Sequence, residues 1–431
     1  MERDPLSTIS SDAAASLDGP DWLRERRIAA AERAASTAVP TTEEEVWRYS
    51  RVGELDLERF DFSPAVITET GVPAALEQIL QQIPERAGLV VVRDGRLVHV
   101  ELDSQWIDKG VGVGNLAEVA DGADVIGSVA GESTDVFSQL NDAFSADPVL
   151  VRVPAGVAVD APIVIAHWTE TPGRAVLPRL VVQTGADAEV QVLDIQASPD
   201  GVEVLVLPIV ELDAGPSSRL RYCNVQVLGD RTWQIASQSA TAAEQATVRS
   251  FTGAFGGEYA RLRTDCRLAG QGATGDLFAV YFGTGEQTLD FRTFQDHAAP
   301  DTTSTLLFKG ALDDSSKSVY TGLIQVRPNA RGTNAFQTNR NVKLSPDAWA
   351  ESVPNLQIEN NDVRCSHAST VGPIDEEQQF YLEARGVPPE VAERLIVGGF
   401  FDEALAGIPV PAAEGLLRGV IALALAEDGA E

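Results

Sequence analysis

The stretch RLVVQTGADAEVQVLDIQASPDGVEVLVLPIVELDAGPSSRLRYCNVQVLGDRTWQIASQSA (residues 179–240) decides the fold of this chain. It consists of strand-like runs rich in Val, Ile and Leu, separated by short turns that contain Gly, Pro and Asp. Similar runs begin near position 147 and continue through most of the following sequence, and no convincing helical pattern interrupts them. The pattern predicts a large core built mainly from β-strands.

The turns in this region are regularly spaced. Small-residue turns recur near Gly156, Gly185, Gly215, Ala246 and Gly275, and each follows the previous one at a nearly constant interval. Later turns follow at about half that interval. A constant step is expected when each coil of a solenoid returns the chain to the same edge. The spacing therefore favours a parallel β-helix over a β-sandwich, although the coils share little sequence identity.

The segments on both sides of the β region are mainly helical. Residues 20–38 are rich in Ala, Arg and Glu, and a segment near the end has apolar residues at helical spacing, namely Val391, Leu395, Ile396 and Phe400. Helical domains at both ends would cover the open ends of a β-helix. We therefore expect a mostly helical N-terminal domain, a β-helix core and a C-terminal helical domain, at residues 1–146, 147–373 and 374–431.

Composition excludes several classes of partner. The net charge of −31 argues against nucleic acid and anionic membranes, which both require a basic surface. The acidic, polar N-terminus is not a secretory signal, and the apolar stretch 415–426 is too short to span a bilayer. Three widely spaced cysteines, Cys223, Cys266 and Cys365, form no disulfide framework. These features predict a soluble, cytoplasmic protein, with Cys223 and Cys266 packed in the core.

The segment NDVRCSHASTVGPIDEEQQFYLEARG (361–386) carries the candidate site. Cys365 and His367 are two positions apart, so in a strand they lie on the same face and could both bind iron or zinc. Asp375, three positions before Gln378, then predicts the start of a helix. On the residues alone, the structural interpretations are favoured: His367 as a buried histidine or a cap for the following helix, and Cys365 as a small buried apolar residue.

Other motifs do not predict catalysis. Gly270-Gln-Gly272-Ala-Thr-Gly275 matches a dinucleotide-binding fingerprint, but a strand-like run follows it instead of a helix, so we interpret it as a coil turn. The chain has no P-loop motif, so it binds no nucleotide itself and any ATP chemistry must come from a partner. His297 and Lys309 are expected to make structural contacts.

Residues 289–401, including LQIENNDVRCSHAST (356–370), resemble the SufB/SufD family of iron–sulfur cluster assembly proteins, and TTEEEVWRYS (41–50) is similar to the start of SufD members. The resemblance implies a right-handed parallel β-helix flanked by helical domains. It also implies that the chain pairs with a SufB homologue through the β-helix cores and binds the SufC ATPase through the C-terminal helices. A cysteine desulfurase system would supply sulfur indirectly.

The resemblance also implies roles for individual residues. Asn360 occupies the position of a SufB cysteine, whereas the Cys-Ser-His form at Cys365 and His367 is similar to SufD. His367 matches the SufD histidine that shares a cluster at the SufB–SufD interface, and Cys365 matches a nearby SufD cysteine. We therefore expect a non-catalytic, SufD-like scaffold with a transient iron–sulfur cluster and with His367 and Cys365 as metal ligands.

Two other interpretations remain open. A parallel β-helix is also the fold of polysaccharide lyases and hydrolases, which need clustered acidic groups on one face of the coil. Alternatively, the chain is a homodimeric scaffold that works without SufB, although Asn360 counts against this.

Overall fold

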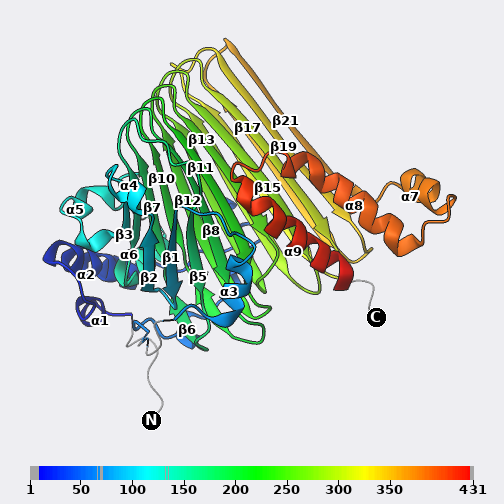
Figure 1. Cartoon of the computed structure of the whole chain (residues 1–431). Coiled ribbons are helices and arrows are strands. Elements are labelled where there is room, and N and C mark those ends of the chain that lie inside the picture. The colour runs from blue at the N-terminus through cyan, green and yellow to red at the C-terminus, as the bar shows by residue number, and fades with distance from the viewer. Residues whose placement is uncertain (1–8, 66, 68–70, 132, 134, 428–431) are drawn as a thin grey trace.

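The computed structural model describes residues 9–65, 67, 71–131, 133 and 135–427. Its core is a parallel β-solenoid in which successive strands alternate between two sheets, with helices before and after them (Figure 1). The predicted fold class, a parallel β-helix core with flanking helices, is confirmed. Among the described residues, no helix is both long and apolar enough to cross a bilayer.

The first sheet runs the length of the solenoid. Its strands are parallel from β1 to β21, and only β2 is antiparallel to its neighbour β1. In spatial order they are β2 (Arg96–Leu102), β1 (Gly88–Arg93), β5 (Ile163–Trp168), β8 (Glu189–Ala197), β11 (Arg219–Val227), β13 (Thr247–Ala254), β15 (Thr274–Gly283), β17 (Thr303–Leu312), β19 (Thr333–Lys343) and β21 (Val363–Pro373).

The second sheet takes the alternate strand of each coil and is parallel except where β3 meets β4. Its order is β20 (Trp349–Ile358), β18 (Lys317–Val326), β16 (Thr288–His297), β14 (Tyr259–Leu268), β12 (Thr232–Ala242), β10 (Ile209–Ala214), β7 (Arg179–Thr184), β4 (Val149–Val153) and β3 (Gly112–Asn115). Two short strands, β6 (Arg174–Val176) and β9 (Val204–Val206), pair with each other, and β9 also pairs with β12.

Strand register confirms the predicted coil step. Arg219 pairs with Thr247, and Thr303 pairs with Asn334, so neighbouring strands of the sheet are separated by one full coil of sequence. One residue with positive φ marks the same turn in successive coils: Gly156, Asp187, Ser217, Gln245, Gly272, Asp301 and Gly332. These positions follow one another at a nearly constant interval, so the repeated turn that the sequence suggested is real.

One of the predicted turns was misplaced. Gly275 lies inside β15, and the turn falls at Gly272. A Cβ atom at Gly275 would come within 2.7 Å of the Cys266 sulfur, so this glycine is required for packing. The interpretation of residues 270–275 as a coil turn holds, because β14 ends before this segment and β15 follows it.

The N-terminal helices pack on the outer face of the second sheet. Trp47, Phe137 and Leu140 form one apolar cluster with side chains of β9, β12 and β14. The helices of this part are α1 (Ser11–Ala15), α2 (Asp21–Ser36), α3 (Ala74–Leu80), α4 (Ser104–Ile107), α5 (Gly122–Val125) and α6 (Val136–Phe144), with the 3₁₀ turns Glu45–Trp47, Val52–Glu54, Leu57–Arg59 and Leu116–Glu118. The helix expected over residues 20–38 is α2, and α3 packs separately against the first sheet.

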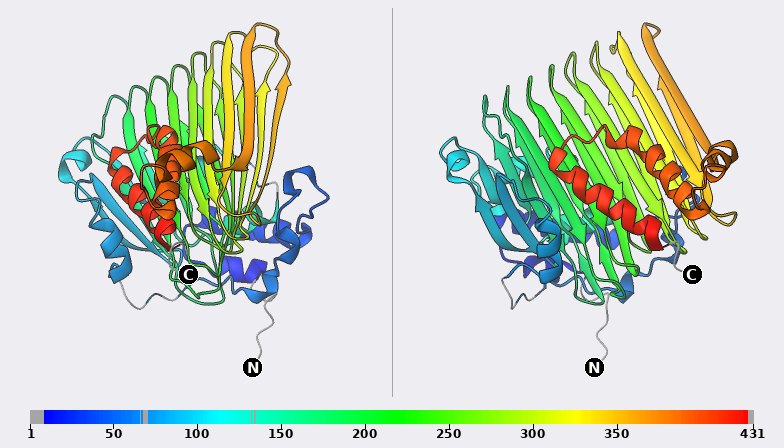
Figure 2. Two further views of the ribbon diagram at one scale, coloured as in Figure 1. Left: turned by 90° about the vertical axis from the view of Figure 1, so that its right-hand side faces the viewer. Right: turned by 45° about the vertical axis from the view of Figure 1, so that its right-hand side comes forward.

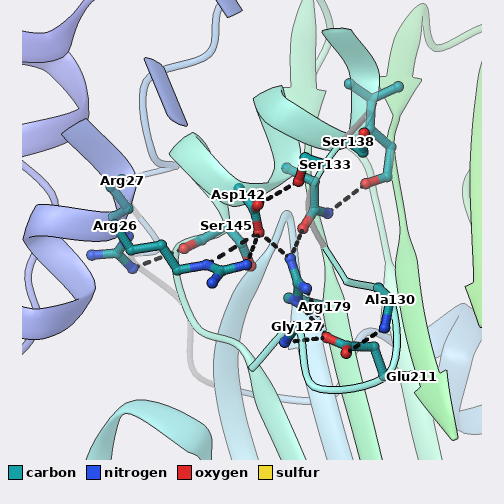
Figure 3. Close-up of polar contacts among 12 residues, drawn as sticks. Arg26, Arg27, Gly127, Ala130, Ser133, Ser138, Asp142, Ser145, Arg179 and Glu211 are labelled. Atoms are coloured by element: carbon teal, nitrogen blue, oxygen red, sulfur yellow. Dashed lines mark hydrogen bonds and ion pairs between the residues drawn. The ribbon is translucent and has the colours of Figure 1, made fainter. Parts of the chain in front are cut away.

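Buried charges fasten α2 and α6 to the second sheet (Figure 3). Arg179 of β7 binds Asp142 of α6 at 2.5 Å and Glu211 of β10 at 2.7 Å, and Arg26 of α2 binds Asp142 at 2.8 Å. Burial opposes ionisation of both carboxyl groups, but the arginine charges outweigh it and lower the pKa of Asp142 and of Glu211. Because every member is paired, the network is a structural anchor.

The C-terminal helices are α7 (Glu376–Glu383), α8 (Pro389–Leu405) and α9 (Glu414–Glu427), with a 3₁₀ turn at Pro411–Ala413. Helices α8 and α9 lie along the outer face of the first sheet, whereas α7 stands clear of the sheets (Figures 1 and 2). Buried side chains of α8 and α9, including Val397, Phe401 and Leu417, share an apolar cluster with the sheet.

Candidate functional site

Both sheets end in open edges at the same end of the solenoid. In the described part of the chain, β20 pairs only with β18, and β21 pairs only with β19. The two terminal strands are also in contact with each other. Unpaired backbone N–H and C=O groups along a strand edge are a template for pairing with another chain.

The predicted ligand pair lies on the terminal strand β21. Cys365 is in register with Ala335, and His367 is in register with Gln337; both β19 partners are buried on the inner face of the first sheet. Cys365 is half-buried and packs in an apolar cluster with Ile324, whereas His367 is exposed. The structure therefore places both side chains on the inner face at the open end, with the imidazole accessible.

The thiol and the imidazole differ in readiness to bind a metal. Burial raises the pKa of Cys365, and a hydrogen bond from the backbone of Ala335 partly opposes the rise. The free chain therefore holds Cys365 mainly as the thiol, which must lose its proton before it can bind a metal. A neutral imidazole, in contrast, can bind a metal without losing a proton.

Asn360, immediately before β21, stabilises a turn. Its amide nitrogen donates to the carbonyl oxygen of Pro328 at 2.7 Å, and its side-chain oxygen accepts a hydrogen bond from the backbone N–H of Asp362 at 2.9 Å. The polar side chain at this position thus has two local partners.

Cys223 and Cys266 are buried in the core, as predicted. Burial is the main cause that raises the pKa of both thiols, to about 12 for Cys266, with nearby carboxylates adding to the effect. Both groups therefore remain protonated and unreactive in the native chain.

His297 and Lys309 make structural contacts, as predicted. The His297 ring binds the Thr302 hydroxyl at 2.8 Å through Nδ1 and the Ser304 hydroxyl at 2.9 Å through Nε2. The Lys309 ammonium donates to the Phe400 carbonyl oxygen at 2.8 Å and pairs with Glu403 at 2.5 Å. Lys309 thus ties α8 to β17.

The buried histidine makes stability depend on pH. Burial lowers the pKa of His297 to about 4, with a small opposing effect of Asp296. The unfolded chain, with an ordinary pKa near 6.5, takes up the proton first, so stability falls as the pH drops from about 6.5 toward about 4. Between pH 7 and pH 5, protonation linked to His297 is expected to lower the free energy of unfolding by about 2 kcal/mol. The substitution His297→Gln should remove this part of the dependence of stability on pH.

Urea unfolding at pH 7 and pH 5 measures this effect, with His99→Gln as the control because the His99 side chain is 40% exposed, in contrast to the enclosed ring of His297. His167, also buried and with its pKa lowered by burial, keeps a remaining slope in both variants. Identical slopes for His297→Gln and wild type would show that the ring is not kept neutral by its surroundings.

Sequence reasoning overlooked the polar side chains behind the ligand pair. Gln337, Asn339 and Asn341 point inward from β19 and are buried. Their alternate spacing in TNAFQTNRNVK was the available signal, because every second residue of a strand shares a face. The interior of the last coils is therefore polar along the C-terminal half of β19, next to the apolar cluster around Ile324.

A groove of about 950 Å³ lies between α7, α8 and the end of β21. Tyr381, Leu395, Ile396 and Phe400 line it, and Tyr381 and Leu395 are exposed. Phe380, also exposed, adds apolar surface on α7. Exposed apolar side chains gathered on neighbouring helices are typical of protein-binding surfaces.

A second hollow, of about 160 Å³, opens on the outer face of the second sheet. Two carboxylates, Asp135 and Asp265, line it, and the buried Asp290 lies behind its arginines Arg261 and Arg292; these acidic groups bear on the carbohydrate-enzyme interpretation. Asp290 pairs with Arg261 and Arg292, and Asp265 pairs with Arg263. Asp290 is in register with Arg261, four positions before Asp265, which separates the backbone positions of the two aspartates by about 13 Å along the strands. The two catalytic carboxyl groups of a glycosidase lie about 5–9.5 Å apart, so Asp265 and Asp290 do not match that arrangement.

Comparison with known families covers nearly the whole chain. The sequence model for "SUF system FeS cluster assembly, SufBD core domain" matches residues 167–400, and that for "SufBD protein N-terminal region" matches residues 11–165. The two matches adjoin one another and include α1 through most of α8 in the structure.

Individual relatives agree. An iron–sulfur cluster assembly SufBD family protein of Mycobacterium tuberculosis is 38% identical over 210 residues, which are 47% of this chain and 53% of the relative, so the match spans about half that protein's length. The corresponding Mycobacterium leprae protein is 34% identical over 61% of this chain and 68% of its own. The iron–sulfur cluster assembly protein SufD of Bacillus subtilis is 25% identical over 93% of this chain and 94% of its own.

Proposed function

Because this chain belongs to the SufBD family of the SUF iron–sulfur cluster assembly system, we propose that it is a SufD-like, non-catalytic scaffold subunit. It pairs with a SufB homologue through the β-solenoid and binds a SufC ATPase through its C-terminal helices. His367, with Cys365 beside it, helps to hold a nascent iron–sulfur cluster at the contact between the two solenoids.

One observation carries this proposal: His367 lies accessible on the inner face of the last strand of an open-ended solenoid. A partner with the same architecture would continue both sheets at once, since it also ends in parallel strand edges. Its side chains would then meet His367 inside the joined solenoid.

The chemistry of the donors supports sharing. Cys365 and His367 would supply two protein ligands. An iron–sulfur cluster usually has about four, which are thiolates or imidazoles. The remaining ligands would come from the partner. A neutral imidazole is a weaker anchor than a thiolate and is released on protonation, which suits a cluster that is cargo and must be passed on.

The three-part division of the chain at residues 1–146, 147–373 and 374–431 is part of the proposal. The third part would dock the ATPase, whose nucleotide supplies the energy, and this chain binds no nucleotide itself. Sulfur would reach the complex from a cysteine desulfurase system.

If the SufB homologue pairs with the open end, the substitution Val371→Asp should weaken that binding strongly. Val371 lies on the inner face of β21 in register with Asn341 and is 41% exposed, so the free chain should tolerate the change. In the joined solenoid the carboxylate would be buried without a partner. We expect the dissociation constant for the SufB homologue to rise at least 100-fold, about 3 kcal/mol, by analytical ultracentrifugation.

The matched control is Val100→Asp. Val100 is also 41% exposed, but it lies on β2 at the opposite edge of the same sheet. If both variants bind the SufB homologue like wild type, the open end is not the pairing surface.

A further inference from the structure

The residue directly behind His367 has an unusual environment. Gln337 is 1% exposed, and neither its side-chain oxygen nor its nitrogen has a hydrogen-bond partner among the described residues. Its Cα is the register partner of His367, and strands in a sheet lie about 4.8 Å apart. The two side chains therefore project side by side into the interior at the open end.

Neighbours of Gln337 on the same face are satisfied. Asn339 donates to the Tyr281 hydroxyl at 3.0 Å, and Asn341 donates to the Asn339 side-chain oxygen at 3.0 Å and accepts from the Tyr281 hydroxyl at 2.7 Å. These amides form a closed network, and Gln337 lies outside it. A buried amide without partners is costly, so its presence calls for an explanation.

Gly322, on the opposite sheet, leaves space for this amide. A Cβ atom at Gly322 of β18 would come within 2.1 Å of the Gln337 side-chain nitrogen, so the amide occupies the space that a side chain at this position would take. The amide therefore reaches across the interior toward the second sheet. On its outer side only the last coil remains, with Pro354 beside Gly322 and His367 beside Gln337.

We propose that Gln337 is a positioning residue for His367. When one ring nitrogen of His367 binds iron, the other ring nitrogen carries a proton, and its N–H donates to the Gln337 side-chain oxygen. Such a bond fixes the tautomer and the orientation of a metal-binding imidazole. The inference rests on the proposed function, because it requires His367 to be a cluster ligand.

If Gln337 positions His367, the substitution Gln337→Leu should not destabilise the free chain but should weaken retention of iron in the assembled complex. Gln337→Leu removes an unsatisfied buried amide, so the thermal unfolding midpoint of the free chain should stay the same or rise. In the complex with the SufB homologue and the ATPase, the same change should speed loss of cluster iron to a chelator about 10- to 100-fold. It should also alter the ¹⁴N hyperfine coupling of the reduced cluster. Gln337→Glu keeps an acceptor oxygen and should restore both properties.

Gln295→Leu is the matched control. Gln295 is also 1% exposed, and neither of its polar side-chain atoms has a partner within the described part of the chain, but it lies on β16 in register with Ile324, two strands from the open end. This variant should leave iron loss and the ¹⁴N coupling unchanged.

The outcomes separate the two proposals. If the wild-type cluster shows no ¹⁴N coupling that disappears in His367→Ala, the proposed ligand role of His367 fails. If that coupling is present but Gln337→Leu leaves it and the iron loss unchanged, only the role of Gln337 fails. A lower unfolding midpoint for Gln337→Leu in the free chain would instead mark the amide as a structural group, held by buried water, and would overturn the assignment.

Discussion

We expect His367→Ala to leave the chain folded and assembled with its proposed partners but to remove most of the cluster from the complex. The side chain is exposed and makes no hydrogen bond or ion pair with another described residue, so the free energy of unfolding should change by less than about 0.5 kcal/mol. Removal of a ligand should lower iron and acid-labile sulfide per complex at least about tenfold after anaerobic reconstitution. Iron and sulfide assays on purified complex measure this, together with the absorption of the cluster.

His99→Ala is the control for this experiment, since its partly exposed imidazole lies on β2 at the other end of the solenoid. Cys365→Ala in parallel tests the second predicted ligand. Equal iron and sulfide contents in His367→Ala and wild type would remove His367 from the site and leave the open end as a pairing surface only.

We expect Leu395→Asp to weaken binding of the proposed ATPase partner strongly. Leu395 is 56% exposed on α8 and lines the groove beside Tyr381, so the substitution should not unfold the chain. A carboxylate in the centre of an apolar docking surface costs about 2–4 kcal/mol, which weakens binding about 30- to 1,000-fold. Calorimetric titration of the chain with the ATPase subunit gives the dissociation constant.

Ile107→Asp is the matched control, because Ile107 is 57% exposed on α4, far along the chain from the C-terminal helices. Deleting the helices would be a poorer test, since Val397, Phe401 and Leu417 belong to a core cluster with the first sheet. If Leu395→Asp and Ile107→Asp bind the ATPase equally well, the docking surface is not the groove of α7 and α8.

The solenoid was predictable from sequence because its repeat is encoded locally. Each coil needs one residue in the left-handed conformation at the same turn, and Gly, Asp, Ser and Gln at those positions left a regular step in the sequence. The exact turn was less predictable, since a glycine can serve packing instead, as Gly275 does beside Cys266. Local sequence does not distinguish these two uses of glycine.

The buried face of α8 was not predictable for a different reason. The spacing of Val391 and Leu395 indicated an apolar stripe, but the structure buries Ala392, Val397 and Phe401 and leaves those two exposed. A helix that is apolar on more than one side has no unique inner face until its neighbours are known. The exposed stripe is what remains for a partner.

The candidate site was predictable only in part. The spacing of Cys365 and His367 implied a common face, and the structure places both on the inner face of β21. That β21 is the last strand, and that Gln337 lies behind the imidazole, depends on pairing between segments that are a full coil apart in the sequence. Sequence periodicity does not specify which polar side chains such pairing brings together.

The unpaired strand edges of β20 and β21 should also affect the chain when it is made in excess of the partners proposed above. Copies of one open-ended solenoid can stack edge to edge. Backbone hydrogen bonds alone do not distinguish a second copy of this chain from the proposed SufB homologue. The charge of −31 opposes such stacking by long-range repulsion, and salt weakens that repulsion. The excess of acidic residues would then limit self-association of the chain until it binds the proposed partner.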